Sequence, residues 1–288
     1  MDNNNSLNLT LTLGRRLLLL FCFIIVCFVL TSIVGGVAIM AFTAQSTPAM
    51  RIITVVQDLL VFIVPAVGTA VIVCRRPDKL LAIDVRPGLT VTLAAVATLL
   101  VSVPMMNAII SLNESIALPS HIEQVLREME TSSSEMIATV IGAHTIANLI
   151  MAILIVGVLA GLSEELLFRG CFQRLLSTGG VAPHAAIWIA AIVFSALHMQ
   201  FYGFIPRMLL GAFFGYLLYW SRSLWMPVIL HITNNTVYLI DDYRAYGVEP
   251  AQGADDGSNL LVVGLSTVLT AVGMYIIYRL THRTKQPE

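Results

Sequence analysis

Long runs of apolar residues are the feature that most limits how this sequence can fold. A helix needs about 20 mostly apolar residues to cross the hydrocarbon core of a bilayer. The chain of 288 residues is 57% hydrophobic and only 11% charged, so a soluble fold could not bury its apolar surface. Eight stretches are candidate spans: residues 17–42, 53–73, 89–112, 136–162, 181–198, 204–220, 224–240 and 259–279.

The length of these stretches also indicates the fold class. A backbone in lipid must satisfy its N–H and C=O groups internally, which leaves helix bundles and closed barrels. Barrel strands are short and alternate in polarity, whereas these stretches are long and uniformly apolar. We therefore expect an all-α, polytopic membrane helix bundle of about eight transmembrane helices, in contact with lipid and located in the plasma membrane.

The basic residues orient this bundle, because cytoplasmic loops of membrane proteins are enriched in Lys and Arg. Eight spans with both termini cytoplasmic place 12 of the 16 basic residues in inner segments. An odd number of spans would move a basic terminus to the outer side. The inner residues are Arg15, Arg16, Arg75, Arg76, Lys79, Arg86, Arg169, Arg174, Arg222, Arg279, Arg283 and Lys285.

Net charge and cysteine content argue against a nucleic-acid-binding protein and against a disulfide-stabilised one. The net charge is -1, and a protein that binds nucleic acid normally presents a basic surface to the phosphates. We therefore expect no nucleic-acid partner. The four cysteines, Cys22, Cys27, Cys74 and Cys171, are scattered, and they suggest neither a disulfide framework nor a paired metal site.

Ionisable residues inside membrane helices are costly, so they mark candidate functional sites. The first cluster contains Glu164, Glu165 and Arg169. Glu165 and Arg169 are four residues apart and share one helix face, which favours a supporting ion pair. Glu164 points about 100° away from Glu165 and is the carboxylate available to face a cavity. A charge cluster at an interfacial helix end has the same pattern.

The second and third clusters contain histidines. His198 closes an apolar stretch, and His231 and Asn235 are four residues apart, so their side chains converge on one face. His198 alone is compatible with simple packing. The pair His231 and Asn235 is also compatible with a hydrogen bond between membrane helices. His144 and Asn148 repeat the same spacing, and we interpret them as packing or interhelical hydrogen bonding.

The depth of each cluster in the membrane decides whether the three can meet. If the fourth helix continues to about Leu176, Glu164 lies about 18 Å above its inner end at 1.5 Å per residue, a depth that overlaps those of His198 and His231. If that helix stopped at residue 162, Glu164 and His198 would lie at opposite faces. The catalytic interpretation therefore requires the long helix.

In order along the chain, Glu-Glu-x-x-x-Arg at 164–169, Phe-x-x-x-His at 194–198 and His-x-x-x-Asn at 231–235 resemble the CPBP family of intramembrane proteases. This family, also called ABI, contains the eukaryotic Ras-converting CAAX prenyl endopeptidase and bacterial proteins tied to bacteriocin processing or self-immunity. The resemblance covers about residues 140–240. It divides the chain into N-terminal membrane helices without a motif (1–135), a CPBP-like catalytic membrane core (136–245), and the last span with a cytoplasmic tail (246–288).

The resemblance implies an endopeptidase that cleaves near the C-terminus or leader of a membrane-associated or prenylated peptide. Such chemistry needs a water-holding cavity, a base, and donors for the oxyanion. Glu164 is expected to be the base, and His198 to hold and activate the water. His231 and Asn235 are expected to donate hydrogen bonds to the oxyanion.

The sequence leaves the cofactor open. A divalent metal such as zinc is compatible with Glu164, His198 and His231 as ligands from three helices, and the family is commonly labelled a metalloprotease. The sequence lacks the His-Glu-x-x-His spacing that presets a zinc site on one helix. The sequence therefore does not decide between a metal-dependent and a metal-free mechanism.

Two other functional classes also place polar groups inside membranes. A proton-coupled transporter uses carboxylates and histidines, but the repeated halves of many carriers are not found in this sequence. An idle membrane partner, such as a bacteriocin immunity protein, needs no catalytic geometry. The three intact motifs favour the protease. The sequence gives no oligomeric state, no particular substrate, and no role for Asp58 in the second span.

Overall fold

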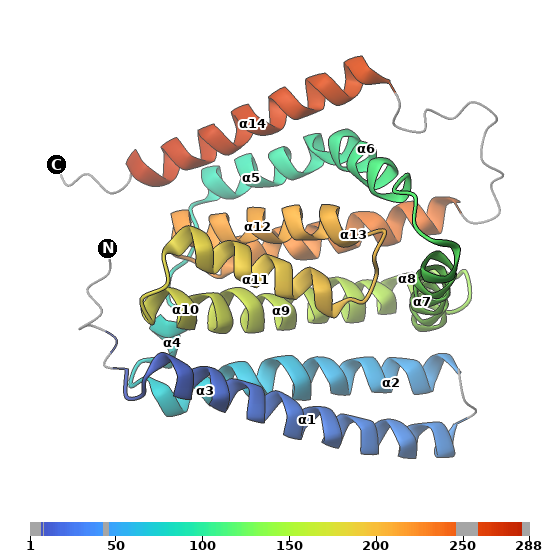
Figure 1. Cartoon of the computed structure of the whole chain (residues 1–288), viewed down its shortest axis with the longest axis horizontal. Coiled ribbons are helices and arrows are strands. Elements are labelled where there is room, and N and C mark those ends of the chain that lie inside the picture. The colour runs from blue at the N-terminus through green and yellow to red at the C-terminus, as the bar shows by residue number, and fades with distance from the viewer. Residues whose placement is uncertain (1–6, 8, 43–45, 246–258, 284–288) are drawn as a thin grey trace.

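The computed structural model describes residues 7, 9–42, 46–245 and 259–283, and these residues form helices without any strand. The predicted all-α fold is therefore confirmed. The helices stack in layers along one shared direction (Figure 1). The start of α1 (Leu13–Ala41) and the end of α14 (Leu260–Arg283) lie at the same end of this stack, which agrees with two termini on one side of a membrane.

Two helices form the N-terminal layer. α1 packs against a second helix that runs without a break for 27 residues. Large apolar side chains such as Leu18 and Phe28 are exposed along α1, as expected for a surface that faces lipid. The second helix consists of α2 (Thr47–Gln57), the π-helical segment η2 (Asp58–Ile63) and α3 (Val64–Val73).

The helix that carries Glu164 has the length that the catalytic interpretation requires, because it continues for 33 residues from Ile146 to Thr178. Two π-helical segments lie on either side of Glu164, and such segments are frequent at functional sites. The parts of this long helix are α8 (Ile146–Ala152), η3 (Ile153–Leu159), α9 (Ala160–Glu165), η4 (Leu166–Gln173) and α10 (Arg174–Thr178).

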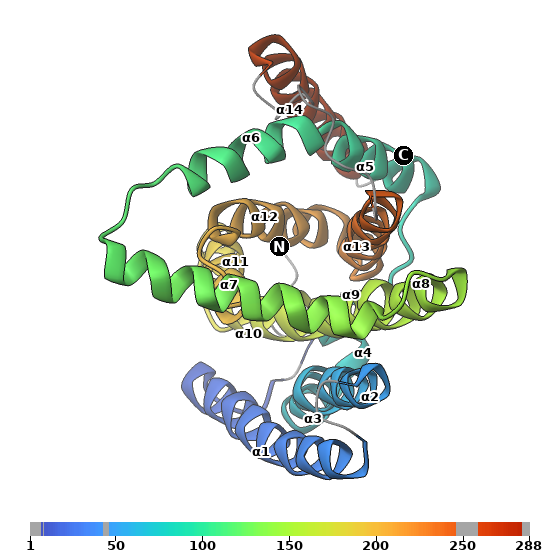
Figure 2. The ribbon, with the colours of Figure 1, turned by 90° about the vertical axis from the view of Figure 1, so that its right-hand side faces the viewer.

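The long helix packs with α11 (Pro183–Leu197), α12 (Phe204–Ser221) and α13 (Trp225–Ala245) in the centre of the molecule. Figures 1 and 2 show this group between the N-terminal layer and an outer layer of α5, α6 and α14. The outer layer and the turn before it comprise α4 (Pro77–Leu80), α5 (Leu89–Val101) and α6 (Val103–Glu114). The helices that carry the three motifs therefore form the core of the bundle.

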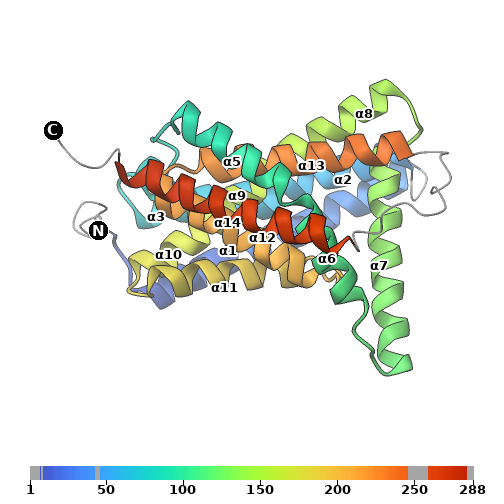
Figure 3. The same cartoon turned by 90° about the horizontal axis from the view of Figure 1, so that it is seen from above.

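The segment between the third and fourth predicted spans, residues 113–135, is not a loop but belongs largely to α7 (Ser120–Ile141). Figures 2 and 3 show that α7 lies crosswise over the end of the bundle. The predicted span 136–162 is wrong at its start, because Gly142 has a φ of +79° and ends α7 before the long helix begins. Glycine adopts this conformation without a steric penalty, so Gly142 separates two helices that the apolar pattern had joined.

The predicted count of eight membrane spans is not confirmed. Four helices among the described residues are long and apolar enough to cross a membrane: Leu13–Ala41, Thr47–Val73, Ile146–Thr178 and Leu260–His282. α5 and α6 make a fifth if they count as one span, since they bend by 44° at a break. α11 has only 15 residues, and α12 and α13 carry polar side chains because their neighbours are other helices.

Candidate active site

Two neighbouring glutamates end α9, between the π-helical segments of the long helix. The side chain of Glu164 is 16% exposed, whereas that of Glu165 is fully buried. Neighbouring helical residues point about 100° apart, so one short segment presents the two carboxylates to different environments. Glu164 is the more accessible of the two.

Glu165 is the centre of a buried ionic network. Its Oε1 accepts a hydrogen bond from Arg169 Nη1 at 2.5 Å, and the same oxygen lies 2.7 Å from His231 Nδ1. Arg169 Nη2 donates to the carbonyl oxygen of Gly211 at 3.2 Å. Buried charges persist only when they are paired and hydrogen-bonded. The network therefore ties together the long helix, α12 and α13.

His231 connects this network to Glu164. An ionised carboxylate can only accept hydrogen bonds, so the contact with Glu165 places a proton on Nδ1 of His231. The other ring nitrogen, Nε2, lies 3.7 Å from Glu164 Oε2. Glu165 thus orients the imidazole with Nε2 turned toward Glu164. The sequence associated Glu165 only with Arg169, because no local spacing reports a contact across 66 residues.

Glycines allow the helices of the site to approach closely. A Cβ atom on Gly161 would lie 3.2 Å from Ile232 Cγ1 and 3.3 Å from its backbone nitrogen. A Cβ atom on Gly211 would lie 3.0 Å from Arg169 Nη2. Small residues at crossing points let membrane helices pack backbone to backbone. These two contacts bring α13 beside α9 and bring the Gly211 carbonyl within reach of Arg169.

Phe194 joins the second motif to the other two. Its ring lies edge-on to His198 and His231, with centroids 4.8 Å and 6.0 Å away. The guanidinium carbon of Arg169 lies 4.3 Å from the centre of the same ring, a favourable cation–π arrangement. The phenylalanine of Phe-x-x-x-His is thus a packing residue on which all three motifs converge.

His198 lies immediately after α11, where the chain turns toward α12. Its Nδ1 is 2.8 Å from the carbonyl oxygen of Phe194. A carbonyl accepts, so Nδ1 carries the proton and Nε2 is the nitrogen with a lone pair in the neutral ring. His198 interacts electrostatically with both Glu164 and His231, which places it in the same polar region.

The turn after His198 is held by hydrogen bonds from a side chain of α6. Asn113 on α6 is 2% exposed, and its Nδ2 donates to the carbonyl oxygens of Phe201 at 2.8 Å and Tyr202 at 2.6 Å. Sequence reasoning missed this contribution, because a single amide just after the third predicted span carries no motif. Asn113 therefore restrains the backbone that positions His198.

Asn235 lies one helical turn after His231 on α13. Its Nδ2 donates to the carbonyl oxygen of Val156, in η3, at 3.0 Å. The structure brings Glu164 and His231 together directly, whereas the amide of Asn235 is directed to the backbone of the long helix. An amide nitrogen has two N–H groups, so this bond leaves one of them for another acceptor.

Asp58, whose role could not be inferred from the sequence, contacts the residue just before the first motif. It is 3% exposed, and its Oδ1 accepts a hydrogen bond from Ser163 Oγ at 3.3 Å. Its Oδ2 is buried without a hydrogen-bond partner. Because Ser163 precedes Glu164, this bond ties the second helix of the N-terminal layer to the candidate site.

The repeated spacing at His144 and Asn148 serves packing, as expected. The ring of His144 stacks on Tyr243 with centroids 3.8 Å apart. Asn148 Oδ1 accepts from Arg51 Nη2 at 3.0 Å, a bond between α2 and α8. This pair shows that the His-x-x-x-Asn spacing alone does not define a site.

The fit of a metal ion can be tested on the three candidate ligands. In the described part of the chain, no group of three His, Cys, Asp or Glu side chains is arranged to hold a metal ion. The Nδ1 bonds of His231 to Glu165 and of His198 to a backbone carbonyl leave only the two Nε2 atoms for a metal, and zinc would need both of them and a Glu164 oxygen at about 2 Å from one point. The residues as placed do not form a metal site, and the mechanism below uses none.

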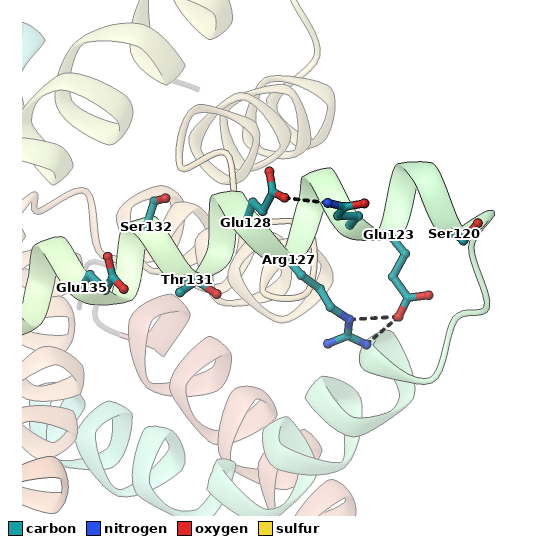
Figure 4. Close-up of a pocket in the computed structure, with 8 residues that line it drawn as sticks. Ser120, Glu123, Arg127, Glu128, Thr131, Ser132 and Glu135 are labelled. Atoms are coloured by element: carbon teal, nitrogen blue, oxygen red, sulfur yellow. Dashed lines mark hydrogen bonds and ion pairs between the residues drawn. The ribbon is translucent and has the colours of Figure 1, made fainter.

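A shallow depression on the surface lies away from these residues. It is lined by side chains of α7, including Ser120, Arg127 and Glu135 (Figure 4). Arg127 there forms an exposed ion pair with Glu123 at 2.8 Å. The depression contains no residue of the three motifs, so we do not assign the activity to it.

Comparison with known proteins agrees with the geometry. Residues 146–237 match the family described as type II CAAX prenyl endopeptidase Rce1-like, which confirms the resemblance to the CPBP family. Searches of curated proteins and of solved structures found no significant match. The matched segment contains all three motifs. Together with the apolar helices, the match indicates an integral membrane protein that is similar to CAAX-type endopeptidases over this segment.

Proposed function

We infer, from this CAAX-endopeptidase match, that the chain hydrolyses a peptide bond near the C-terminus or leader of a membrane-associated or prenylated peptide in the plasma membrane. One observation carries the proposal. His231 Nε2 lies 3.7 Å from Glu164 Oε2 while Glu165 holds the other ring nitrogen. A histidine oriented by one carboxylate and facing a second is an arrangement suited to acid–base chemistry.

In the first step, a water held between Glu164 and Nε2 of His198 attacks the carbonyl carbon of the scissile bond. Glu164 accepts the proton that the water loses, and the electrons of the carbonyl double bond move onto its oxygen. Low exposure of the site keeps this charge transfer away from bulk water, where hydrogen bonds to the reacting groups are weaker.

In the second step, the tetrahedral intermediate breaks its carbon–nitrogen bond. His231, as an imidazolium with a proton on each ring nitrogen between Glu165 and Glu164, donates from Nε2 to the oxyanion, and Asn235 donates from its second N–H group, until the carbonyl reforms. Glu164 returns its proton to the leaving amine, so that no net proton is gained or lost. Glu165 and Arg169 act only through His231, as positioning residues.

The test compares the parent protein with Glu164→Gln and Glu164→Ala in mild detergent. Each is incubated with quenched peptides that include a farnesylated CAAX peptide and a leader peptide. We expect the parent to cleave at least one peptide, and loss of the base to reduce the rate by roughly 10²- to 10⁴-fold. Glutamine keeps the shape of the side chain, so its effect reports on the chemistry.

His144→Ala is the matched control, because His144 has the same spacing to an asparagine, lies outside the three motifs and stacks on Tyr243. It should cleave like the parent. Equal cleavage by the parent and Glu164→Ala, or cleavage by neither, would contradict the proposal. Each reaction is also run with a strong chelator, and unchanged rates are the outcome expected of a mechanism that uses only the side chains named above.

A further inference from the structure

Arg207, in the first turns of α12, has unused hydrogen-bonding capacity. Its Nη2 donates to Gln200 Oε1 at 2.6 Å, and its Nη1 is buried without a partner. Within the described residues it forms no ion pair with a carboxylate. A buried guanidinium with an unmatched N–H group is costly, so this arrangement is suited to an anion that is not part of the chain.

The position of Arg207 connects it to the proposed reaction. Its charge interacts first with Glu130 on α7 and then with Glu164, in both cases without a direct ion pair, and His198 also interacts electrostatically with Arg207. The backbone between His198 and Arg207 is the turn that Asn113 fixes. The cation is therefore held beside the reacting groups by the same turn that positions His198.

In the structure a neutral amide contacts this cation. Gln200 accepts from Arg207 and donates through Nε2 to Glu130 Oε1 on α7 at 3.1 Å. Glu130 Oε2 is itself buried without a hydrogen-bond partner. An ionised acceptor makes roughly twice as strong a hydrogen bond to Arg as a neutral one. A carboxylate entering the site can therefore displace the Gln200 oxygen and use Nη1 as well.

We propose that Arg207 binds the free C-terminal carboxylate of the peptide substrate. This assignment rests on the proposed endopeptidase function and deepens it. The planar guanidinium pairs with a carboxylate through two parallel bonds, which Nη1 and Nη2 can supply once Gln200 moves. With the chain end anchored beside the base, cleavage falls a short distance from the C-terminus and releases a short peptide acid.

The experiment measures binding, so that it does not depend on turnover. Glu164→Gln, in detergent, receives two farnesylated, fluorescently labelled peptides that differ only in ending as a free acid or as an amide. We expect the free acid to bind roughly ten- to a hundredfold more tightly, the range for a hydrogen bond to a charged group. Adding Arg207→Gln should weaken binding of the acid to the level of the amide and leave the amide unchanged.

Two further variants sharpen this test. Arg127→Gln removes a cation of α7 that already pairs with Glu123, and it should preserve the preference for the acid. Glu130→Gln removes the negative charge beside Gln200, and it should strengthen binding of the acid only. This second variant tests the proposal even if Arg207→Gln does not fold.

Equal binding of acid and amide, binding of neither, or a loss of both in Arg207→Gln would overturn the assignment. Failure of the proposed function has a different signature. In that case the acid is still preferred through Arg207, but protein with an intact Glu164 does not cleave it.

Discussion

Glu165 Oε1 is the atom on which the geometry of the site depends most, because it contacts both Arg169 and His231. The Glu165–Arg169 pair could be predicted, since a spacing of four residues puts two side chains on one helix face. The bond from Glu165 to His231 and the contribution of Asn113 could not be predicted from the sequence. They join residues far apart in the chain, and a single amide or carboxylate leaves no periodic pattern.

The first prediction compares two Arg–Glu pairs of identical spacing. Arg169→Met removes the guanidinium from the buried Glu165 carboxylate and leaves it only the contact with His231, and breaking a buried ion pair costs about 3–5 kcal/mol. Arg127→Met breaks an exposed pair with Glu123, and such pairs contribute little because water screens them. We therefore expect Arg169→Met to lower the apparent melting temperature in detergent far more than Arg127→Met. Equal small losses would show that the buried network does not stabilise the bundle.

At the scale of helices, the catalytic interpretation required the helix that carries Glu164 to continue to about Leu176. The structure confirms this, because that helix runs from Ile146 to Thr178. The break before it was missed. The apolar pattern runs through residues 136–162 without interruption, and one glycine within an apolar pattern is tolerated in many helices. Only the backbone angle of Gly142, φ +79°, shows that the chain turns there. Beside this turn, Arg51 on α2 donates to the carbonyl oxygens of Val140 and Ile141, a long-range contact that no local pattern reports.

The second prediction concerns the crossing of α9 and α13. Gly161→Leu places a side chain against Ile232 and the backbone of His231, so the two helices must move apart. A misplacement of about 1 Å can lower catalysis by about 10²-fold, and we expect a loss of this order in kcat/KM. Gly264→Leu on α14 is the control, because nothing lies within 4 Å of a Cβ atom there. The prediction is wrong if both variants keep full activity.

For the whole molecule, composition was sufficient to predict a membrane helix bundle but not the number of spans. Length and hydropathy identify a helix that lipid surrounds. α11 is short, and α12 and α13 are partly polar because other helices surround them. α7 was hidden by its acidic residues, which are as typical of a loop as of a helix lying across the bundle end.

The third prediction tests the orientation of the bundle. The start of α1 and the end of α14 share one end, and α7 lies at the other (Figures 1 and 3). His282→Cys should therefore react with an impermeant maleimide only from the cytoplasmic side, and Ser132→Cys only from the outer side. The parent, with its four native cysteines, gives the background. Labelling of both variants from the same side would contradict this topology.

The shared oxygen of Glu165 also constrains how such a protein can change over evolutionary time. Loss of Glu164 abolishes the proposed base without leaving a buried charge unpaired, so a lineage can discard catalysis there and still fold. Loss of Arg169 or His231 disturbs a buried carboxylate and endangers the whole bundle. Descendants that survive only as binding proteins should therefore keep residues equivalent to Arg169 and His231. The residue equivalent to Glu164 alone should distinguish them from enzymes.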